Sequence, residues 1–459
     1  MNLPSSFLLT VHGSVLWFDE PTNTLRHGPV ESAPRNLRVE NRAGRDALIA
    51  TTPAGAVTLD GLRPDGRLGR SPGGAPLVLR RGHLPDGLIA LEANGVFLCA
   101  EADGTVSLTR TQQGAWEMFA PVEEADLDWL AELTRRAWVS VSQDAVLAAG
   151  AVRPADDFRV QAGPITVRLA DVLTARPAAG QREITLHYDG WKIERLTPWR
   201  PLVYMAAFGG DDVFACLSLA LHSLRQFGRY DGAILLFTDR MPSDLAGIVP
   251  AGMERQITLA TAPARDHLDY AAVKYRIHGM PALAGYEPLL YLDSDVICDQ
   301  PIGGLLRAVH RASHVCLALE DDLLGAHDLY GAHLFAEDRT AFPRNERGAA
   351  SALMGIPHIG VARRCFPAIL ASLYALSRTT GTRQPLAWHD QPVLNYVLHK
   401  LDSMDVDVLT PRVVTPVDPV TPPSSMRRLG FAHFGGGGGT AGGKLAAMRA
   451  YLEWLRDGQ

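Results

Sequence analysis

The pattern of hydrophobic positions changes twice along the chain and divides it into three parts. In the first part, residues 1 to 122, short apolar or alternating runs are separated by Gly, Pro, Asn and Asp, as in Val96 to Cys99 and Thr105 to Leu108. Asn94-Gly95 and Asp103-Gly104 have the residue types of tight hairpin turns. Many short strands at this close spacing predict an all-β unit.

The second part, residues 123 to 197, begins with helical spacing and then alternates. Apolar residues about one turn apart predict a helix from Glu124 to about Ser142. The residues with this spacing are Leu127, Leu130, Leu133 and Trp138. Residues 143 to 197 then alternate between apolar and polar positions, and prolines follow. We interpret this part as a connecting helix and strands.

The third part, residues 198 to 459, alternates between strand-like and helical runs. Leu202 to Ala207 has the pattern of a strand, and Phe214 to Phe227 that of a helix. The alternation continues through Ala233 to Phe237, Gln256 to Leu259, Tyr270 to Gly279 and Leu289 to Leu292. Such alternation predicts an α/β sheet of parallel strands covered by helices. Ligands of such sheets bind beyond the carboxyl ends of the strands.

Two acids one residue apart stand at one of these strand ends, in the stretch YLDSDVIC. In extended backbone, residues two apart point to the same side about 6.6 Å from each other. Asp293 and Asp295 can therefore address one ligand while Ser294 faces away. Two carboxylates beside a diphosphate suit Mg²⁺ or Mn²⁺. An acidic turn without a ligand is the alternative.

Composition narrows the classes of protein to consider. Hydrophobic residues make up 47% and charged residues 20% of 459 residues, which excludes wholesale disorder. No uninterrupted apolar run approaches the length that crosses a bilayer. The formal net charge of -6, without a dense basic run, argues against nucleic acid as a partner.

The N-terminus and the cysteines bear on location. The first apolar stretch has no Lys or Arg before it, so we do not expect a secretory signal. The five scattered cysteines form no CxxC pair, which suggests reduced thiols instead of a disulfide framework or a zinc site. The expected location is the cytoplasm, with peripheral attachment at the inner face of the membrane left open.

Residues 94 to 119, NGVFLCAEADGTVSLTRTQQGAWEMF, carry a resemblance. The segment is similar to the repeat of fascin-like β-trefoil domains, in which a Gly-aromatic-Leu-x-Ala-Glu run, an Asp-Gly turn and a Trp-Glu-x-Phe closure recur. The resemblance implies a β-trefoil over residues 1 to 122. Such domains often bind glycans or proteins. We nevertheless expect Trp116 and Phe119 to be core residues.

Four segments of the third part carry a second resemblance. They are MAAFGGDDVFACLSLALHSL (205 to 224), DYAAVKYRIHGMP (269 to 281), WHDQPVLNYVLHK (388 to 400) and FAHFGGGGGTAGGK (431 to 444). With the paired acids, residues 201 to 459 resemble the nucleotide-sugar-dependent glycosyltransferases of GT-A fold. The most similar group is the retaining one that includes bacterial lipopolysaccharide galactosyltransferases and glycogenin. The resemblance implies a Rossmann-like α/β domain.

The resemblance also implies which residues bind the nucleotide. Ala206, Ala207 and Asp212 would hold the base and ribose, with Asp211 as the competing choice for the acid. An acidic helix N-terminus, which the helix dipole favours, is the alternative. Lys274 would extend toward the donor, although a lysine on a solvated helix face is the competing interpretation.

Metal binding follows from the same resemblance. His433 would join Asp293 and Asp295 as the third metal ligand, and an imidazole beside carboxylates suits Mn²⁺ better than Mg²⁺. Asp293 and Ser294 are also expected to contact the nucleotide. Lys444 would contact the diphosphate, but it lies eleven residues after His433 where the family has six. Glycine amides of the intervening run are the alternative contact.

The segment around Asp390 matches the family's Asp-Gln-x-x-Leu-Asn motif. Asp390 and Gln391 would lie beside the anomeric carbon and stabilise the charge that develops there; a helix cap is the alternative for Asp390. Where relatives have an Asn that faces the sugar, this chain has His358. If the His358 side chain contacts the donor sugar, the enzyme would select a different sugar from those relatives.

The sequence therefore predicts a metal-dependent glycosyltransferase that moves a hexosyl group from a nucleotide diphosphate sugar, in the first instance a UDP-sugar, to an acceptor hydroxyl. Retention of configuration follows from the resemblance alone. An inverting base remains open among Glu320, Asp321 and Asp322. One rival is a sugar-nucleotide nucleotidyltransferase, although the stretch Phe208 to Asp212 is acidic where that class has basic residues. The other rival is a glycan- or protein-binding protein with an inert catalytic domain.

Overall fold

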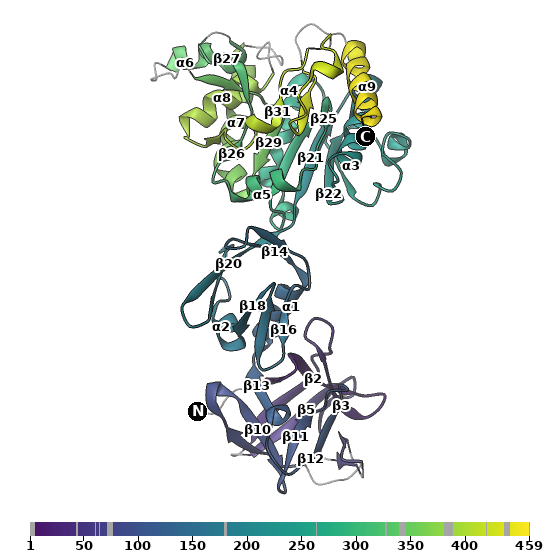
Figure 1. Cartoon of the computed structure of the whole chain (residues 1–459), viewed down its shortest axis with the longest axis vertical. Helices are drawn as coiled ribbons and strands as arrows, with labels where there is room; N and C mark the ends of the chain where they lie inside the picture. Colours follow the sequence, from purple (N-terminus) through teal and green to yellow (C-terminus); the bar gives the residue numbers. More distant parts are fainter. Residues whose placement is uncertain are drawn as a thin grey trace. The chain divides into compact units, whose positions relative to one another are not determined.

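The computed structural model describes residues 5–42, 45–59, 61–63, 65–70, 77–178, 181–262, 264–325, 328–338, 346–380, 389–418, 420–435 and 441–458. The chain divides into two compact units, Met1–Trp199 and Arg200–Gln459 (Figure 1). The boundary lies two residues after the end of the expected connecting segment. Each unit has its own core and is described separately.

The first part of the N-terminal unit consists of strands and short 3-10 turns. Its largest sheet has the order β12-β11-β10-β13-β1-β2-β3, with β9 paired to β10. These strands are β1 (Phe7–Thr10), β2 (Ser14–Asp19), β3 (Thr24–Pro29), β9 (Arg80–His83), β10 (Ile89–Ala93), β11 (Val96–Ala100), β12 (Val106–Arg110) and β13 (Met118–Val122). A second sheet contains β4 (Leu37–Arg42), β5 (Arg45–Thr52) and β6 (Gly55–Thr58), and a two-stranded sheet contains β7 (Gly61–Leu62) and β8 (Leu68–Gly69).

The hairpin turn expected at Asn94-Gly95 is confirmed, because both residues have positive φ and connect β10 to β11. Alternate residues of these strands, such as Leu91, Leu98 and Leu108, meet in one apolar core. The trefoil arrangement itself stays a prediction.

One expectation about this core is wrong. Phe119 is fully buried, but 39% of Trp116 is exposed. Trp116 lies in the 3-10 turn η2 (Ala115–Glu117) before β13, where it packs on polar side chains. The ring of His12 meets it edge-on at 5.6 Å, and the guanidinium of Arg110 lies 6.0 Å from it. These contacts keep Trp116 at the surface.

Residues 123 to 199 form a folded module within the N-terminal unit. Its sheets have the orders β15-β14-β20-β19 and β16-β17-β18, and two helices pack with them. The elements are α1 (Glu124–Arg135), β14 (Ala137–Ser140), β15 (Ala145–Leu147), β16 (Val152–Ala155), β17 (Arg159–Ala162), β18 (Ile165–Arg168), α2 (Leu169–Thr174), β19 (Ile184–Tyr188) and β20 (Lys192–Trp199). The helix expected to reach Ser142 ends at Arg135. The residues after it leave the helix because they pair with β15 and β20, and Trp138 is buried in that strand.

The C-terminal unit is built on a mixed sheet of order β23-β22-β21-β24-β29-β26-β30. Its strands are β21 (Leu202–Ala207), β22 (Ala233–Thr238), β23 (Ile257–Thr261), β24 (Leu289–Asp293), β26 (Val315–Cys316), β29 (Leu353–Ile356) and β30 (Met404–Asp405). The first four strands in this order are parallel, as expected, whereas β29 runs antiparallel to β24. The register places Ala206 of β21 opposite Asp293 of β24.

Two smaller sheets accompany it. β25 (Val296–Cys298) pairs with β32 (Phe431–His433), which pairs with β31 (Val413–Val414). β27 (Leu319–Leu323) pairs with β28 (Arg347–Ala349). Because β25 directly follows β24, the first of these sheets connects the end of β24 to β32, which lies much later in the chain.

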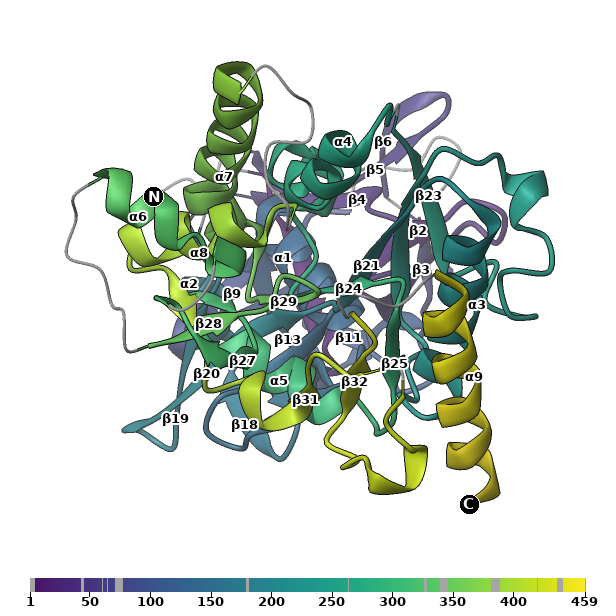
Figure 2. The same cartoon turned by 90° about the horizontal axis from the view of Figure 1, so that it is seen from above.

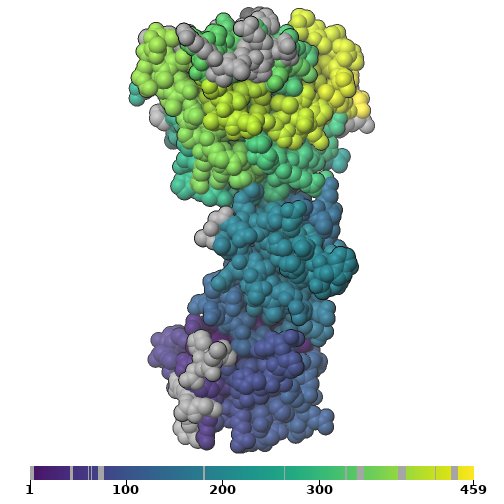
Figure 3. All heavy atoms as spheres, turned by 90° about the vertical axis from the view of Figure 1, so that its left-hand side faces the viewer, coloured from purple at the N-terminus to yellow at the C-terminus, as the bar shows by residue number. Residues whose placement is uncertain are grey.

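Helices cover both faces of the main sheet or pack on the helices that do so. They are α3 (Asp211–Gln226), α4 (His267–Val273), α5 (Gly303–Arg311), α6 (Ala332–Asp338), α7 (Ile359–Thr380), α8 (Gln391–Lys400) and α9 (Ala441–Asp457). Seen from above, α3 and α9 lie together on one side, and α4 and α7 lie on the other (Figure 2). The face of this unit turned toward the viewer in Figure 3 is largely green and yellow, so late residues form much of its surface. In α9, residues from Met448 to Leu455 pack on α3.

Helix α7 is long and apolar enough to cross a membrane by length and composition alone. One side of it is nevertheless buried in the core of the C-terminal unit, against β21, β24 and α8. The buried side includes Val361, Cys365, Phe366, Ile369 and Leu373. This spacing is typical of a core helix.

Candidate functional site

A cavity of about 710 Å³ opens where β21 and β24 end. Ala206 and Asp293 line it from these strand ends, Gln391 from α8, His433 from β32 and Lys444 from α9. Its volume lies within the range of small-molecule sites. Sheets with parallel strands bind ligands at this edge, because the strand ends leave polar backbone and side-chain groups exposed there.

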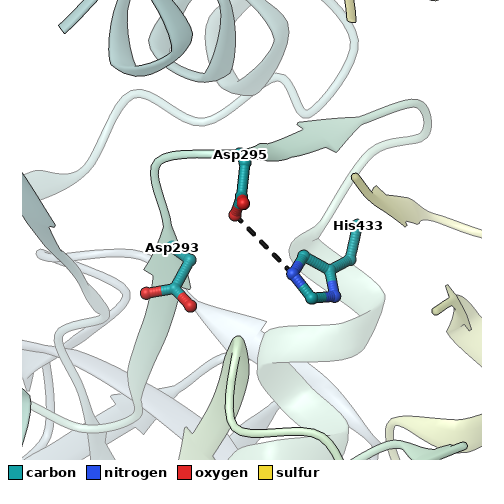
Figure 4. A group of neighbouring side chains, drawn as sticks. All are labelled: Asp293, Asp295 and His433. Atoms are coloured by element: carbon teal, nitrogen blue, oxygen red, sulfur yellow. Dashed lines mark ion pairs between the residues drawn. The ribbon is translucent and has the colours of Figure 1, made fainter. Parts of the chain in front are cut away.

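Asp293, Asp295 and His433 form a compact group in this cavity (Figure 4). One ligand atom from each lies within 4.8 Å of the others. The local fold produces this arrangement, since β24 ends at Asp293 and β25 starts after Asp295 and pairs Val296 with His433. Two carboxylates and an imidazole are a donor set that fits Mn²⁺.

The two acids differ in their surroundings. Burial raises the pKa of Asp293, although the ammonium of Lys274 opposes this, and the Tyr291 hydroxyl donates a hydrogen bond to the carboxyl. Burial also disfavours ionisation of Asp295, but attraction from His433 and Lys444 prevails and lowers its pKa. Asp295 is therefore the carboxylate that stays ionised most readily.

Lys444 reaches the site despite its unusual spacing. Its Nζ donates to Oδ2 of Asp295 at 2.8 Å, from the first turn of α9. Residues 436–440, which include all of the preceding glycine run except Gly435, lie outside the described residues. An ammonium group at this position can contact either Asp295 or an anionic ligand beside it.

Lys274 is buried and not on a solvated helix face. It lies in the 3-10 turn η4 (Lys274–Gly279) after α4, and its Nζ is 2.9 Å from Oδ2 of Asp390. The same Nζ donates to the carbonyl of Ser351 at 3.1 Å. Burial opposes the charge of Lys274, yet Asp390 and Asp293 together raise its pKa. The side chain of Asp390 also accepts from the Tyr275 hydroxyl and makes no capping hydrogen bond to α8.

Gln391 is fixed from both ends of its amide. Its Nε2 donates to Oε2 of Glu320 at 3.0 Å, and its Oε1 accepts from the backbone N–H of Ser351 at 3.2 Å. Asn395, one turn later, exchanges hydrogen bonds with both backbone groups of Ala349 and so joins α8 to β28. Gln391 therefore lines the cavity in one defined orientation.

The cavity is strongly acidic. Among the described residues that line it, six carry carboxylates and two carry ammonium groups. They are Asp293, Asp295, Glu320, Asp321, Asp322 and Asp390, with Lys274 and Lys444. An anionic ligand would be repelled here unless a cation entered with it.

The chain matches no protein-family model and no curated protein.

Some of the expected residues lie elsewhere. Within the described part of the chain, the residues lining the cavity do not include Ala207, Asp212, Ser294 or His358. Asp212 is exposed in the first turn of α3, and the N–H of Gly360 donates to the His358 ring. Their roles toward a nucleotide or sugar stay predictions.

An aromatic wall of the cavity was not expected from the sequence. The rings of Phe208 and Tyr270 stack with centroids 5.2 Å apart, and those of His267 and His389 lie 5.7 Å apart. All four residues line the cavity. Tyr270 stands four residues before Lys274, and His389 directly precedes Asp390, so closeness in sequence to the acidic and basic residues was the available signal.

Proposed function

We propose that this chain is a metal-dependent glycosyltransferase of GT-A type, which moves a hexosyl group from a nucleotide diphosphate sugar to an acceptor hydroxyl with retention. The observation that carries the proposal is the convergence of Ala206, Asp293 with Asp295, Asp390 with Gln391, and His433 on one cavity. These residues come from four separate segments; the paired acids were expected at such a site from their chemistry, and the others from the family resemblance.

Asp293, Asp295 and His433 would hold Mn²⁺ or Mg²⁺. When bound, the metal offsets negative charge on the departing diphosphate. The donor set supports this role, and the acidity of the cavity requires a cation beside an anionic donor. Lys444 is positioned to transfer its contact from Asp295 to a phosphate oxygen.

Asp390 and Gln391 would face the sugar. Lys274 and Tyr275 hold Asp390, while Glu320 and the Ser351 amide hold Gln391. Groups that are fixed before the substrate arrives stabilise developing charge without the cost of reorientation. Tyr270, whose ring stacks on that of the buried Phe208, offers an aromatic surface for a base of the nucleotide such as uracil.

The test is a screen of UDP- and GDP-sugars for nucleotide release, with and without Mn²⁺. Wild type is compared with Asp295→Ala and with the control Asp407→Ala, whose exposed carboxylate is not among those lining the cavity. We expect metal-dependent release in wild type and in the control, and a loss of at least about 100-fold in Asp295→Ala. Absence of both binding and release with every donor would refute the enzyme and favour a binding protein.

A further inference from the structure

A buried carboxylate connects two parts of the cavity. Glu320, in β27, is 6% exposed. Its Oε2 accepts from the Tyr330 hydroxyl at 2.8 Å and from Nε2 of Gln391 at 3.0 Å. Its Oε1 accepts from the hydroxyl of Thr415 at 3.3 Å. Glu320 is thereby held in place on one side and directed at Thr415 on the other.

Thr415 in turn contacts His433. Oγ1 of Thr415 lies 2.8 Å from Nδ1 of the imidazole. A hydroxyl has one hydrogen, and that of Thr415 is directed to Glu320, which can only accept as a carboxylate. The hydrogen between Thr415 and His433 must then come from the ring, so Nδ1–H donates to Oγ1.

In a neutral ring, this assignment also determines whether the other nitrogen, Nε2, carries a hydrogen or a lone pair. In a neutral imidazole with a hydrogen on Nδ1, the Nε2 atom carries a lone pair. Nε2 faces Oδ1 of Asp295 at 3.6 Å. In this neutral, metal-binding form, the Nε2 lone pair and the carboxylates of Asp295 and Asp293 form a place for a cation, whereas a protonated ring attracts Asp295. Hydrogen bonds that orient a histidine ligand in this way raise its affinity for metal.

We propose that Glu320 and Thr415 are positioning residues that hold His433 with its Nε2 lone pair directed at a divalent cation. The inference rests on the proposed function in one respect, namely that the group of Asp293, Asp295 and His433 binds Mn²⁺. The new element is the hydrogen-bond chain from Glu320 through Thr415 to His433. Glu320 also anchors Gln391, so one carboxylate orients both the metal ligand and the amide that faces the sugar.

The experiment measures binding of Mn²⁺ alone to the full chain, from the loss of the free Mn²⁺ signal in electron paramagnetic resonance. Thr415→Val keeps the shape of the side chain and removes the hydroxyl, and Thr415→Ser restores it. Thr421→Val is the matched control, because Thr421 is half-buried like Thr415, follows it six residues later, and makes no side-chain hydrogen bond among the described residues. Thermal unfolding of each variant verifies that it is folded.

We expect Thr415→Val to weaken Mn²⁺ binding about 10- to 100-fold, with Thr415→Ser and Thr421→Val close to wild type. Glu320→Gln should lose less than Thr415→Val, since its amide oxygen can still accept from Thr415. If wild type binds Mn²⁺ and folded Thr415→Val binds it equally well, the hydrogen-bond chain has no positioning role. That result refutes this inference and leaves the proposed function intact. If wild type binds no Mn²⁺, both the metal site of the proposed function and this inference are refuted.

Discussion

Nζ of Lys274 lies 2.9 Å from Oδ2 of Asp390, and both side chains are almost completely buried. The two residues belong to different elements, η4 and the start of α8, so their ion pair joins two sides of the cavity. A buried pair of this kind is more costly to break by removing one partner than to replace as a whole.

Lys274→Met should therefore destabilise the chain by about 3–5 kcal/mol, because it leaves the carboxylate of Asp390 buried without its counter-charge. The double variant Lys274→Met/Asp390→Asn should lose much less than the sum of the two single changes. Urea-induced unfolding of the three variants measures both quantities. Equal stability of Lys274→Met and wild type would show that the ion pair does not hold the cavity together.

Lys444 donates to Asp295 and, under the proposed function, would compete with the metal for this carboxylate, so its removal should have opposite effects on two ligands. Lys444→Met should bind Mn²⁺ about tenfold more tightly, because one positive charge no longer repels the cation. In the presence of saturating Mn²⁺ the same variant should bind UDP less tightly than wild type. Isothermal titration of each ligand gives both values, and Arg456→Gln near the other end of α9 is the control. Tighter binding of UDP by Lys444→Met would contradict the assigned phosphate contact.

The exposure of Trp116 makes a second pair of variants informative. Trp116→Ala should change the free energy of unfolding by less than about 1 kcal/mol, as is usual for surface positions. Phe119→Ala, three residues later in the same segment, should cost about 3–5 kcal/mol because it empties part of the core. Urea-induced unfolding measures the two changes. A large loss from Trp116→Ala would mean that its contacts with His12 and Arg110 stabilise the unit.

His27 gives the N-terminal unit a dependence on pH. Burial lowers the pKa of His27, and the stacked ring of His12 lowers it further. A hydrogen bond to the carbonyl of Glu101 acts in the opposite direction. The folded state thus takes up the proton less readily than the unfolded chain, whose histidines have a pKa of about 6.5. Stability should be unaffected by His27 above that pH and should fall as the pH drops below it.

The measurement compares urea-induced unfolding at pH 5.5 and pH 7.5 for wild type and His27→Gln. The variant should lose less stability than wild type on going to pH 5.5, because it lacks the group that resists protonation. His187→Gln, at an exposed histidine, should behave as wild type. An identical pH dependence of His27→Gln and wild type would remove His27 as its source.

Local patterns predicted the elements that present the site better than they predicted its contacts. The alternation of strands and helices after residue 200 located β21, β22 and β24, and the acids at the end of β24 marked the cavity. Periodicity failed at Trp138, because its helical spacing continued by chance into a strand whose pairing partners lie elsewhere in the chain. The exposure of Trp116 depends on the side chains that surround the turn η2, and no local sequence pattern specifies these contacts.

Contacts between distant segments account for most of what the sequence could not provide. Nothing near Lys274 indicates that its ammonium group meets Asp390 and not a ligand, since that depends on how α8 packs beside η4. The same holds for Glu320, whose partners Tyr330, Gln391 and Thr415 come from three other segments. Such contacts are properties of the folded core, and residue types alone cannot select them.

The pairing of β25 with β32 also has a consequence for the order of events during synthesis. Asp293 and Asp295 leave the ribosome well before His433, because β32 follows β25 much later in the chain. Until then β25 lacks β32 as its partner, and the two carboxylates lack both the imidazole and Lys444. Strands β21, β22, β23 and β24 can pair before then, but the group formed by Asp293, Asp295 and His433 is completed only after β32 has emerged.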